Sequence, residues 1–410
     1  MTGYCIATYR CFDDKADFHK KATGIAVGLT VGSWTELPEA QKAEMEKHLG
    51  KVLSVEEHAA DASKTGERYA DIKIAYPDLN FSKDLPALLV TVFGKLSMDG
   101  KIKLLDLEVS DSFASGFPGP KFGLEGVRSL VDVQKRPLLM SIFKSVIGHD
   151  MSNLKEQFYQ QALGGVDLIK DDEILFENEL TPLEKRVEAC MDAARKAERE
   201  TGQKLLYAVN ITGPTSKLAD NARKAIAAGA NAILFNVLSY GYDALHELSK
   251  DASINVPIAA HPAMAGASYP SPHYGIGASL LLGKLMRLAG ADLVLFPSPY
   301  GSVVMPKEEN LAVKHALLKP LHELKTSFPV PSAGIHPGLV ELIIRDFGTD
   351  VVVNAGGGIH GHPMGTAAGG QAFRQAIDAT LDGSGLREAA KRPGNEALAA
   401  AIDAWGIREE

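Results

Sequence analysis

The sequence predicts an α/β protein with two domains: an N-terminal α+β, ferredoxin-like domain over residues 1–125, and a (β/α)8 TIM barrel with C-terminal helices over residues 126–410. Before residue 126, strand-like and helix-like segments follow one another in no repeating order. After Arg136, short apolar runs alternate with helical stretches, and there are eight such runs. Eight βα units are the number that closes a TIM barrel.

In the first domain, alternation of apolar and polar residues predicts strands, and one segment has helical periodicity. The helix covers Asp17–Gly28, and Ser110–Phe122, which is rich in Gly, Pro and Ser, is expected to be a linker. The expected strands are Ile6–Phe12, Lys51–His58, Tyr69–Tyr76, Ala87–Phe93 and Ile102–Val109.

Each of the eight later runs is far enough from the next to leave room for a crossover helix, which parallel strands require. An open doubly wound sheet is the alternative, but no Gly-x-Gly-x-x-Gly follows a first strand. The expected strands are Leu138–Phe143, Val166–Lys170, Leu205–Ile211, Ala232–Asn236, Val256–Ala260, Asp292–Phe296, Val330–Ala333 and Val351–Ala355. The expected helices include Ser152–Leu163, Pro182–Thr201, Leu218–Ala228 and Ile276–Ala289, with further helices and a charged tail from about Ala368 to Glu410.

The composition indicates a globular protein, with 45% hydrophobic and 23% charged residues among 410. A net charge of −8 argues against general binding to nucleic acid or to an anionic membrane. The three cysteines Cys5, Cys11 and Cys190 are widely spaced and form no disulfide framework, so we expect a cytoplasmic protein. The N-terminus has no signal-peptide pattern, and no apolar run is long enough to cross a bilayer.

The active site of a TIM barrel lies where the strands end, and the second predicted strand ends in Lys170-Asp171-Asp172-Glu173. Asp172 and Glu173 carry the hard oxygen ligands that Mg²⁺ prefers. Lys170 would repel that ion unless its charge were changed. An ion-pair network at a solvated strand end would explain the same residues, and these residues alone do not decide between the two.

Other polar residues follow the remaining strands. Gly356–Gly358 follow the eighth strand, and the loops after strands seven and eight are the usual phosphate site of this architecture. We therefore expect a phosphate cradle formed by Ser332, Gly334, Gly356 and Gly357. The third and fourth strands end near Asn210 and Asn236, to which the sequence assigns no role.

Two lysines are candidate bases, because desolvation or a nearby cation can bring the pKa of an amine toward neutrality. Lys144 ends the first barrel strand, and Lys95 follows an apolar segment of the first domain. His261 at the fifth strand could hydrogen-bond a phosphate or a carbonyl, or be purely structural. His360 and His362 form a His-x-His without a third ligand, which favours structural roles.

Together these motifs resemble the ribulose bisphosphate carboxylase large-subunit family, over about residues 25–375. The most specific element is Lys170-Asp171-Asp172-Glu173, which resembles the activation-lysine motif of that family. The other matching segments are Gly165-Val166-Asp167-Leu168, Arg136-Pro137-Leu138-Leu139 followed by Lys144, the phosphate loops Ser332-Ala333-Gly334 and Gly356-Gly357-Gly358, and Gly32-Ser33-Trp34-Thr35.

The resemblance implies that Lys170 reacts with CO₂ to form a carbamate. Together with Asp172 and Glu173, this carbamate would hold one Mg²⁺ per subunit. It also implies a homodimer with its active site at the subunit interface, where the N-terminal domain of one chain covers the barrel mouth of its partner.

Three positions depart from the carboxylase pattern. Val146 stands in place of a second lysine, Pro262 in place of an arginine, and Pro306 in place of the loop lysine, with Lys307 one position off. Carboxylation is therefore not expected. Enolisation needs only a base and a metal.

Lys95 in Phe93-Gly94-Lys95-Leu96 stands where carboxylases have an asparagine and resembles an enolising branch of the family that acts in methionine salvage. This implies an isomerase that converts 2,3-diketo-5-methylthiopentyl 1-phosphate to its 2-hydroxy-3-keto-1-enyl tautomer. Lys95 would remove the C1 proton as general base. The implied substrate-binding residues are Lys144, Lys170, Asp171, Asp172, Glu173, His261, Ser332, Gly334, Gly356 and Gly357.

Three alternatives remain open at this stage. The same scaffold could act on another phosphorylated ketose or sugar acid. A Schiff-base aldolase could use Lys170 or Lys144. A non-catalytic phosphate sensor could retain the loops without turnover.

Overall fold

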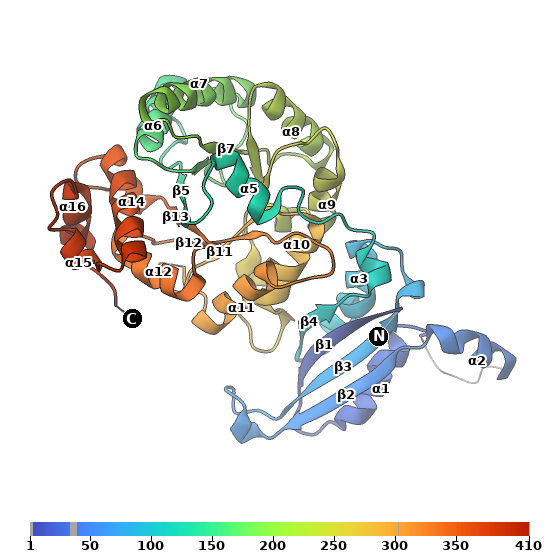
Figure 1. The fold of residues 1–410 in the computed structure, drawn as a ribbon. Coiled ribbons are helices and arrows are strands. Elements are labelled where there is room, and N and C mark those ends of the chain that lie inside the picture. Colours follow the sequence, from blue (N-terminus) through green and yellow to red (C-terminus); the bar gives the residue numbers. More distant parts are fainter. Residues whose placement is uncertain (1–2, 33–38, 302, 410) are drawn as a thin grey trace.

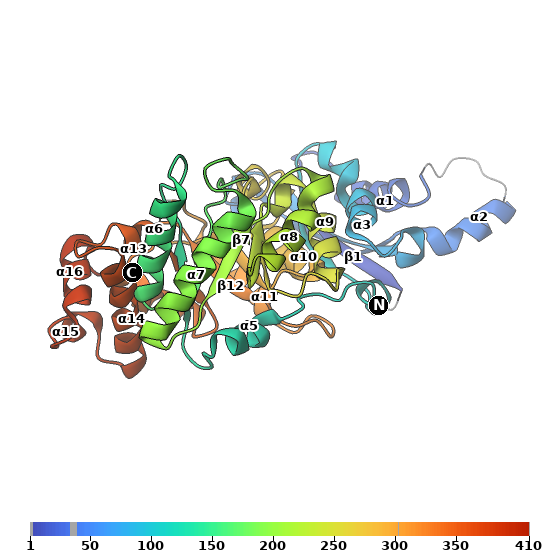
Figure 2. The same ribbon diagram turned by 90° about the horizontal axis from the view of Figure 1, so that it is seen from above.

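The computed structural model describes residues 3–32, 39–301 and 303–409. Ser33, Trp34 and Thr35, which belong to one of the motifs used above, lie outside the described residues. Two sheets organise the chain, a five-stranded N-terminal sheet and an eight-stranded parallel barrel. Figures 1 and 2 show the N-terminal sheet on one side of the barrel and the last helices, from α14 (Thr366–Asp382) to α16 (Glu396–Trp405), on the other.

The N-terminal sheet has the strand order β10-β4-β1-β3-β2. Its edge strand β10 comes from the later part of the chain and pairs parallel with β4. Lys103 on β4 strengthens this junction, because its buried ammonium donates to the carbonyl oxygens of Tyr269 and Ser271, both at 2.6 Å. The strands are β1 (Tyr4–Phe12), β2 (Lys51–His58), β3 (Tyr69–Pro77), β4 (Ile102–Glu108) and β10 (Gly275–Ile276), and the helices are α1 (Phe18–Gly28) and α2 (Glu39–Met45).

The strand predicted at Ala87–Phe93 is wrong, because this segment is helical. It forms α3 (Leu85–Leu89), which continues into a π-helical turn at Val90–Gly94. Asp84 caps the helix by accepting a hydrogen bond from the Ala87 N–H at 2.7 Å, and Pro86 lies in its first turn. The predicted linker also contains a short helix, α4 (Asp111–Ala114).

The predicted barrel is confirmed, with eight strands whose pairings among the described residues are all parallel. The strands are β5 (Leu138–Ile142), β6 (Leu168–Lys170), β7 (Leu206–Asn210), β8 (Ala232–Phe235), β9 (Ile258–Ala260), β11 (Leu293–Pro297), β12 (Phe328–Ser332) and β13 (Val352–Ala355). The helices are α5 (Gly123–Val131), α6 (Met151–Leu163), α7 (Leu183–Thr201), α8 (Leu218–Ala227), α9 (Tyr242–Lys250), α10 (Leu285–Ala289), α11 (Lys307–Leu318), α12 (Val340–Phe347), α13 (Gly357–His360), α14 (Thr366–Asp382), α15 (Leu386–Ala389) and α16 (Glu396–Trp405).

The barrel closes between β12 and β13, where the described residues share no backbone ladder. The Phe328 N–H donates to the Asp292 carbonyl oxygen, and the Ser332 carbonyl oxygen accepts from the Ser298 N–H. Backbone groups of a parallel strand alternate in direction, so the nitrogens of Pro329 and Pro331 face the β13 side. Proline has no N–H to donate, which explains the missing ladder. A side-chain hydrogen bond joins the two strands instead, from Asn354 Nδ2 to Ser332 Oγ at 2.8 Å.

One end of the barrel is plugged by α5, which lies across it in Figure 1. Leu124, Val127 and Val131 of this helix pack with the apolar residues inside the barrel. The buried Asp292 carboxylate anchors the start of α5 by accepting from the N–H groups of Phe122 and Gly123, at 2.8 and 2.7 Å. The opposite end, where the strands finish, is therefore the open mouth. In the described ranges, no helix has the length and hydropathy needed to cross a membrane.

Candidate active site

A hollow of about 330 Å³ lies at the mouth of the barrel. Most of the residues predicted to bind substrate line it, although they are far apart in the sequence. They come from the ends of β5, β6, β9, β12 and β13 and include Lys144, Lys170, Glu173, His261, Ser332, Gly334, Gly356 and Gly357. The barrel topology thus brings together what the sequence places at separate strand ends.

Lys170 is at the centre of this group and is almost completely buried, with 1% of its surface exposed. Its Nζ donates to the carbonyl oxygen of Asp171 at 2.9 Å and lies 3.8 Å from Glu173 Oε2. Burial lowers the pKa of Lys170 to about 8, although the nearby carboxylates of Glu173 and Asp172 oppose this shift. The neutral amine, which is the form that reacts with CO₂, is therefore accessible near neutral pH.

Asp172 lies beside Lys144, whose Nζ is 2.8 Å from Asp172 Oδ2. Burial of Asp172 opposes ionisation, but the hydrogen bond and charge of Lys144 lower the pKa of this carboxyl below its usual value. With Lys170 as an amine, the described residues contain no cluster of three or more His, Cys, Asp or Glu side chains that could hold a metal ion. Asp172 and Glu173 supply two oxygen donors of the kind that Mg²⁺ prefers.

His261 is held as a neutral hydrogen-bond donor. Its Nδ1 accepts from the N–H of Ala263 at 3.2 Å, so the ring proton is assigned to Nε2. Nε2 lies 3.6 Å from Glu173 Oε2. Burial, together with the charges of Lys170 and Lys144, keeps the pKa of His261 well below its usual value. The imidazole can donate to an oxygen in the hollow without carrying a charge.

The loop after β12 turns sharply at Ala333 and Gly334, which both have a positive φ, 75° and 67°. Such backbone directs consecutive N–H groups to one side, as in anion-binding nests. Just after β13, a Cβ added at Gly356 would lie 2.9 Å from Lys144 Cε, whereas one at Gly357 would meet nothing within 4 Å. Glycine at 356 thus allows Lys144 to pass close to the strand and reach the mouth.

Two of the predicted substrate ligands, Asp171 and Asp172, do not line the hollow. Asp172 reaches it only through Lys144, and Asp171 is fully buried. The Asp171 carboxylate accepts from the Tyr207 hydroxyl at 2.6 Å and from the Asn210 N–H at 2.9 Å, and pairs with Arg186 at 3.3 Å. Asp171 therefore fixes the end of β6 against its neighbours in the barrel wall.

Asn210 and Asn236 hold the loop that carries the two carboxylates. Asn210 Nδ2 lies within 3.1–3.3 Å of the carbonyl oxygens of Asp172, Glu173 and Leu175. Asn236 Nδ2 donates to the Glu173 carbonyl oxygen at 2.9 Å. The sequence placed both asparagines at strand ends, but their partners are backbone atoms, which no sequence pattern identifies.

The two histidines of the His-x-His have structural partners. His360 Nε2 donates to the Ile142 carbonyl oxygen at 2.8 Å, and His362 Nε2 to that of Ala397 at 2.9 Å. Each ring therefore joins two segments of backbone, in agreement with the structural roles favoured from the sequence.

Two family models match the chain. The model of the ribulose bisphosphate carboxylase large chain, N-terminal domain, matches residues 4–113, and that of its catalytic domain matches residues 123–303 and 302–405. The chain belongs to the ribulose bisphosphate carboxylase large-chain family.

Curated members of this family are similar over nearly their whole length. A protein from Geobacillus thermodenitrificans, named 2,3-diketo-5-methylthiopentyl-1-phosphate enolase, is 56% identical over 410 residues, 98% of each chain. A protein of the same name from Bacillus licheniformis is 55% identical over 401 residues, with the same coverage. Among solved structures, a rubisco-like protein (MtnW) from Alicyclobacillus acidocaldarius has a TM-score of 0.92 at 48% identity, covering 99% of this chain and 100% of the other. Octameric Rubisco from Pyrococcus horikoshii has a TM-score of 0.90 at 31% identity, covering 100% and 95%.

The structure shows where the residues lie at which the sequence departs from the carboxylase pattern. Val146 is buried, and Pro262 lines the mouth without a charge. Lys307 does not replace the missing loop lysine, because its Nζ pairs with Asp346 Oδ2 at 2.9 Å and it does not line the hollow.

Lys95 is not at the mouth of its own barrel. Its exposed side chain borders a separate hollow on the N-terminal unit, together with Lys21 and Asp99. Apolar side chains near Lys95 are also exposed, Val90 at 69% and Met98 at 80%. Within one chain, Lys95, the expected base, therefore lies apart from the other site residues.

Replacing Asn210 with Ala should loosen the loop that carries Asp172 and Glu173. Because the lost hydrogen bonds stabilise the loop by about 1–2 kcal/mol, we expect the amide hydrogens of residues 171–176 to exchange roughly tenfold faster. Hydrogen-exchange mass spectrometry measures this directly. Asn395→Ala, which removes a side-chain hydrogen bond to the Ala389 carbonyl oxygen, is the control and should leave residues 171–176 unchanged. Unaltered exchange in Asn210→Ala would show that the side chain does not hold the loop.

Proposed function

We propose that the chain catalyses the Mg²⁺-dependent keto–enol isomerisation of 2,3-diketo-5-methylthiopentyl 1-phosphate in methionine salvage, and is not a carboxylase. The observation that carries this proposal is the 56% identity, over 98% of the chain, to a relative named as the enolase for this substrate. The missing carboxylation residues, at Val146, Pro262 and Pro306, agree with it. The three buried, unpaired cysteines are compatible with a cytoplasmic enzyme.

The residues present fit a single Mg²⁺ per subunit if Lys170 is carbamylated. The carbamate, Asp172 and Glu173 would then hold the ion, since the Lys170 amine lies 3.8 Å from Glu173 Oε2 and feels the charge of the Asp172 carboxylate. When bound, Mg²⁺ supplies Lewis acidity that polarises the adjacent carbonyl oxygens of the diketone and stabilises the enolate as charge develops.

The remaining residues orient the substrate and move a proton. The phosphate lies against the backbone of Gly334, Gly356 and Gly357, which fixes the position of C1. The neutral His261 and the Lys144 ammonium donate hydrogen bonds to carbonyl oxygens. Lys95 removes a proton from C1, and the electron pair forms the C1–C2 double bond while the C2 oxygen gains the proton that completes the enol.

We further propose that Lys95 acts across a homodimer interface, from an N-terminal domain at residues 1–125. Exposed apolar side chains surround the mouth on four different loops, including Ile147, Phe176, Met264 and Val303. Others flank Lys95. Apolar surface of this kind marks a contact with another chain. Relatives with solved structures are described as a dimeric archaeal Rubisco and an octameric Rubisco. Docking would bury Lys95, and burial favours the neutral amine that a base requires.

Deuterium incorporation at C1 of the diketone phosphate tests the function. The wild-type protein should exchange this proton only with Mg²⁺ and bicarbonate present. Lys95→Ala should lower the exchange rate by about 10²–10⁴-fold, the usual contribution of a general base. Lys21→Ala, which removes a lysine from the same hollow, is the matched control and should retain most of the exchange.

Full exchange by Lys95→Ala would exclude Lys95 as the base while leaving the substrate assignment intact. Absence of exchange by well-folded wild-type protein would exclude this substrate. Other phosphorylated ketoses and sugar acids would then be tested on the same metal site.

Mixing two inactive variants tests the cross-subunit arrangement. Lys95→Ala and Lys170→Ala each lack one part of the site. After dissociation and reassociation, half of the dimers combine the two chains and contain one complete site, so about a quarter of the wild-type activity should return. A lysine that acts in its own chain would give no recovery, because every chain would still lack one part.

The buried amine of Lys170 should determine how activation by CO₂ depends on pH. Because the pKa of Lys170 is about 8, the neutral fraction rises with pH and reaches half at that value. At constant dissolved CO₂, the initial rate of carbamate formation should rise about fivefold from pH 7 to 8 and less than about twofold from pH 8 to 9. Carbon-13 NMR with labelled CO₂ follows the carbamate directly. A rate that kept rising about sevenfold between pH 9 and 10 would indicate an ordinary, solvated lysine.

A further inference from the structure

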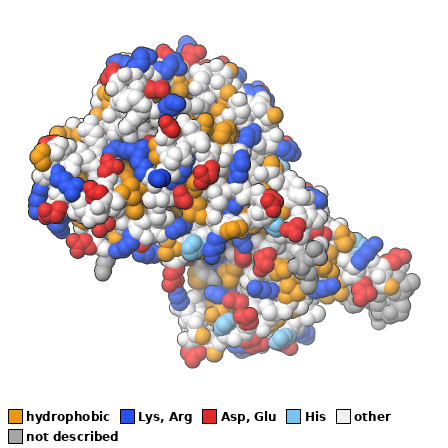
Figure 3. Space-filling view, viewed as in Figure 1, with side chains coloured by type: hydrophobic (Ala, Val, Ile, Leu, Met, Phe, Trp, Pro, Cys, Tyr) orange, Lys and Arg blue, Asp and Glu red, His pale blue; other side chains and the backbone are white. Residues whose placement is uncertain are grey.

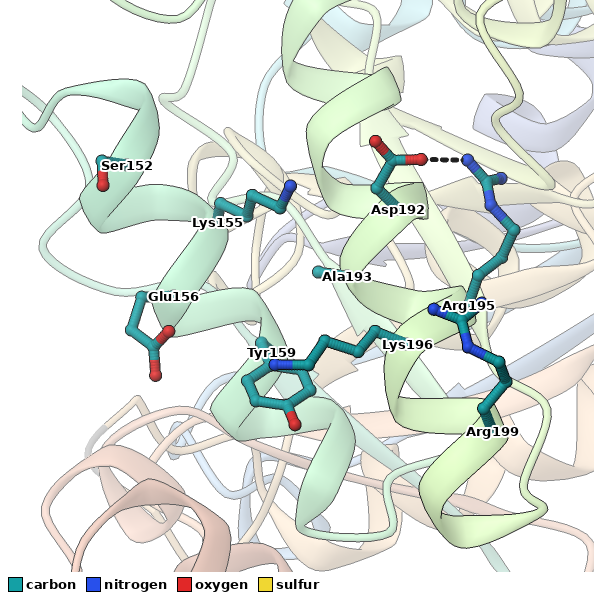
Figure 4. Close-up of a pocket in the computed structure, with 9 residues that line it drawn as sticks. All are labelled: Ser152, Lys155, Glu156, Tyr159, Asp192, Ala193, Arg195, Lys196 and Arg199. Carbon is teal, nitrogen blue, oxygen red and sulfur yellow. Dashed lines mark hydrogen bonds and ion pairs between the residues drawn. The ribbon is translucent and has the colours of Figure 1, made fainter.

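A second hollow, of about 420 Å³, lies outside the barrel between α6 and α7. Figure 4 shows its lining residues, with those of α6 facing those of α7 across the space. The volume is within the range of small-molecule sites. No residue of this hollow belongs to the candidate active site.

The hollow exists because one face of each helix turns toward the other. The α6 residues are spaced three or four positions apart, and the α7 residues follow the same helical spacing, which places each set on one face. Between them, the small buried side chain of Ala193 leaves room. The lining residues are Ser152, Lys155, Glu156 and Tyr159 from α6, and Asp192, Ala193, Arg195, Lys196 and Arg199 from α7.

Tyr159 forms a fixed aromatic wall of this hollow. Its hydroxyl donates to the Glu200 carboxylate, at 2.7 and 2.8 Å from the two oxygens. The Lys196 ammonium lies over the ring, 4.0 Å from the centroid. The tyrosine therefore bridges the two helices and holds one cation in place.

Positive charge is in excess in the hollow, although the whole chain carries −8. Four cations face two carboxylates. Asp192 pairs with Arg195, and Glu156 accepts from the Gln160 amide at 2.9 Å. In the described ranges, Lys155, Lys196 and Arg199 have no carboxylate partner. Figure 3 shows lysine and arginine side chains gathered along this edge of the molecule.

We propose that this hollow is a binding site for a small molecule that carries a diphosphate or triphosphate group. The three cations without a carboxylate partner match the charge of a diphosphate, which is roughly −3 near neutral pH. One phosphate group carries about −1.5 to −2 at this pH. The Arg199 guanidinium can hold phosphate oxygens in a fork, and the two lysines act as point charges. The Tyr159 ring carries the Lys196 ammonium on its face and so positions this cation for the phosphate groups.

Isothermal titration of the full-length protein with pyrophosphate, and separately with a nucleoside triphosphate, tests the site. The buffer contains no divalent cation, because both probes chelate Mg²⁺. A variant of the hollow, called the groove variant because the hollow is a groove between α6 and α7, combines Lys155→Gln, Lys196→Gln and Arg199→Gln. The matched control removes the same charge from exposed positions elsewhere, with Lys204→Gln, Lys217→Gln and Lys224→Gln.

We expect saturable binding, weakened at least about tenfold in the groove variant and nearly unchanged in the control. Lys196→Arg, which keeps the charge, should retain binding. Equal affinity for the two probes would assign the site to the phosphate groups alone, and tighter binding of the nucleotide would assign it to a nucleotide.

Three results would overturn the proposal: no saturable binding of either probe, equal weakening in the groove and control variants, or binding that the groove variant leaves intact and Lys144→Gln at the mouth removes. Deuterium exchange at C1 provides a folding control, since the groove lies outside the barrel and its variant should exchange normally.

Discussion

Burying an ammonium group costs free energy unless anions or hydrogen bonds accompany it, and Lys170 is buried at the end of β6 with few of either. Its own chain supplies one carbonyl oxygen and, at longer distance, two carboxylates. The arrangement around the mouth follows from this constraint. The carboxylates must be held close, which the asparagine contacts do. Burial, together with the positive charges of Lys170 and Lys144, keeps the pKa of His261 low and the ring neutral.

The barrel could be predicted from the sequence because its signal is periodic and repeated. Eight apolar runs with helices between them have few other solutions, and the topology then gathers the strand ends without further information. The prediction of a strand at Ala87–Phe93 was wrong for the opposite reason. It is a single short apolar run, whose helical state depends on the Asp84 cap and on burial of Leu85, Leu88 and Val92 at helical spacing.

The location of site residues could be predicted where they end a strand, as for Lys170 and the glycine loops, which all line the mouth, and their roles stay predictions. Asp171 was grouped with its neighbours, but consecutive residues of an extended chain point to opposite sides, so Lys170 reaches the mouth and Asp171 the wall. The contacts of Asn210 with three carbonyl oxygens could not be predicted, since they depend on how the loop after β6 folds back. Nor could the sequence show that Lys307 is engaged by Asp346.

Because of the prolines of β12, one pair of neighbouring barrel strands has no backbone ladder among the described residues. Around the rest of the wall, backbone hydrogen bonds join neighbouring strands, but β12 and β13 meet through Asn354 and Ser332. The two glycine loops that line the mouth follow these same two strands. An anion bound between these loops would therefore link β12 to β13, the least connected part of the wall. Binding at the mouth would then also complete the closure of the barrel, and the protein with bound anion would be more rigid than the free protein.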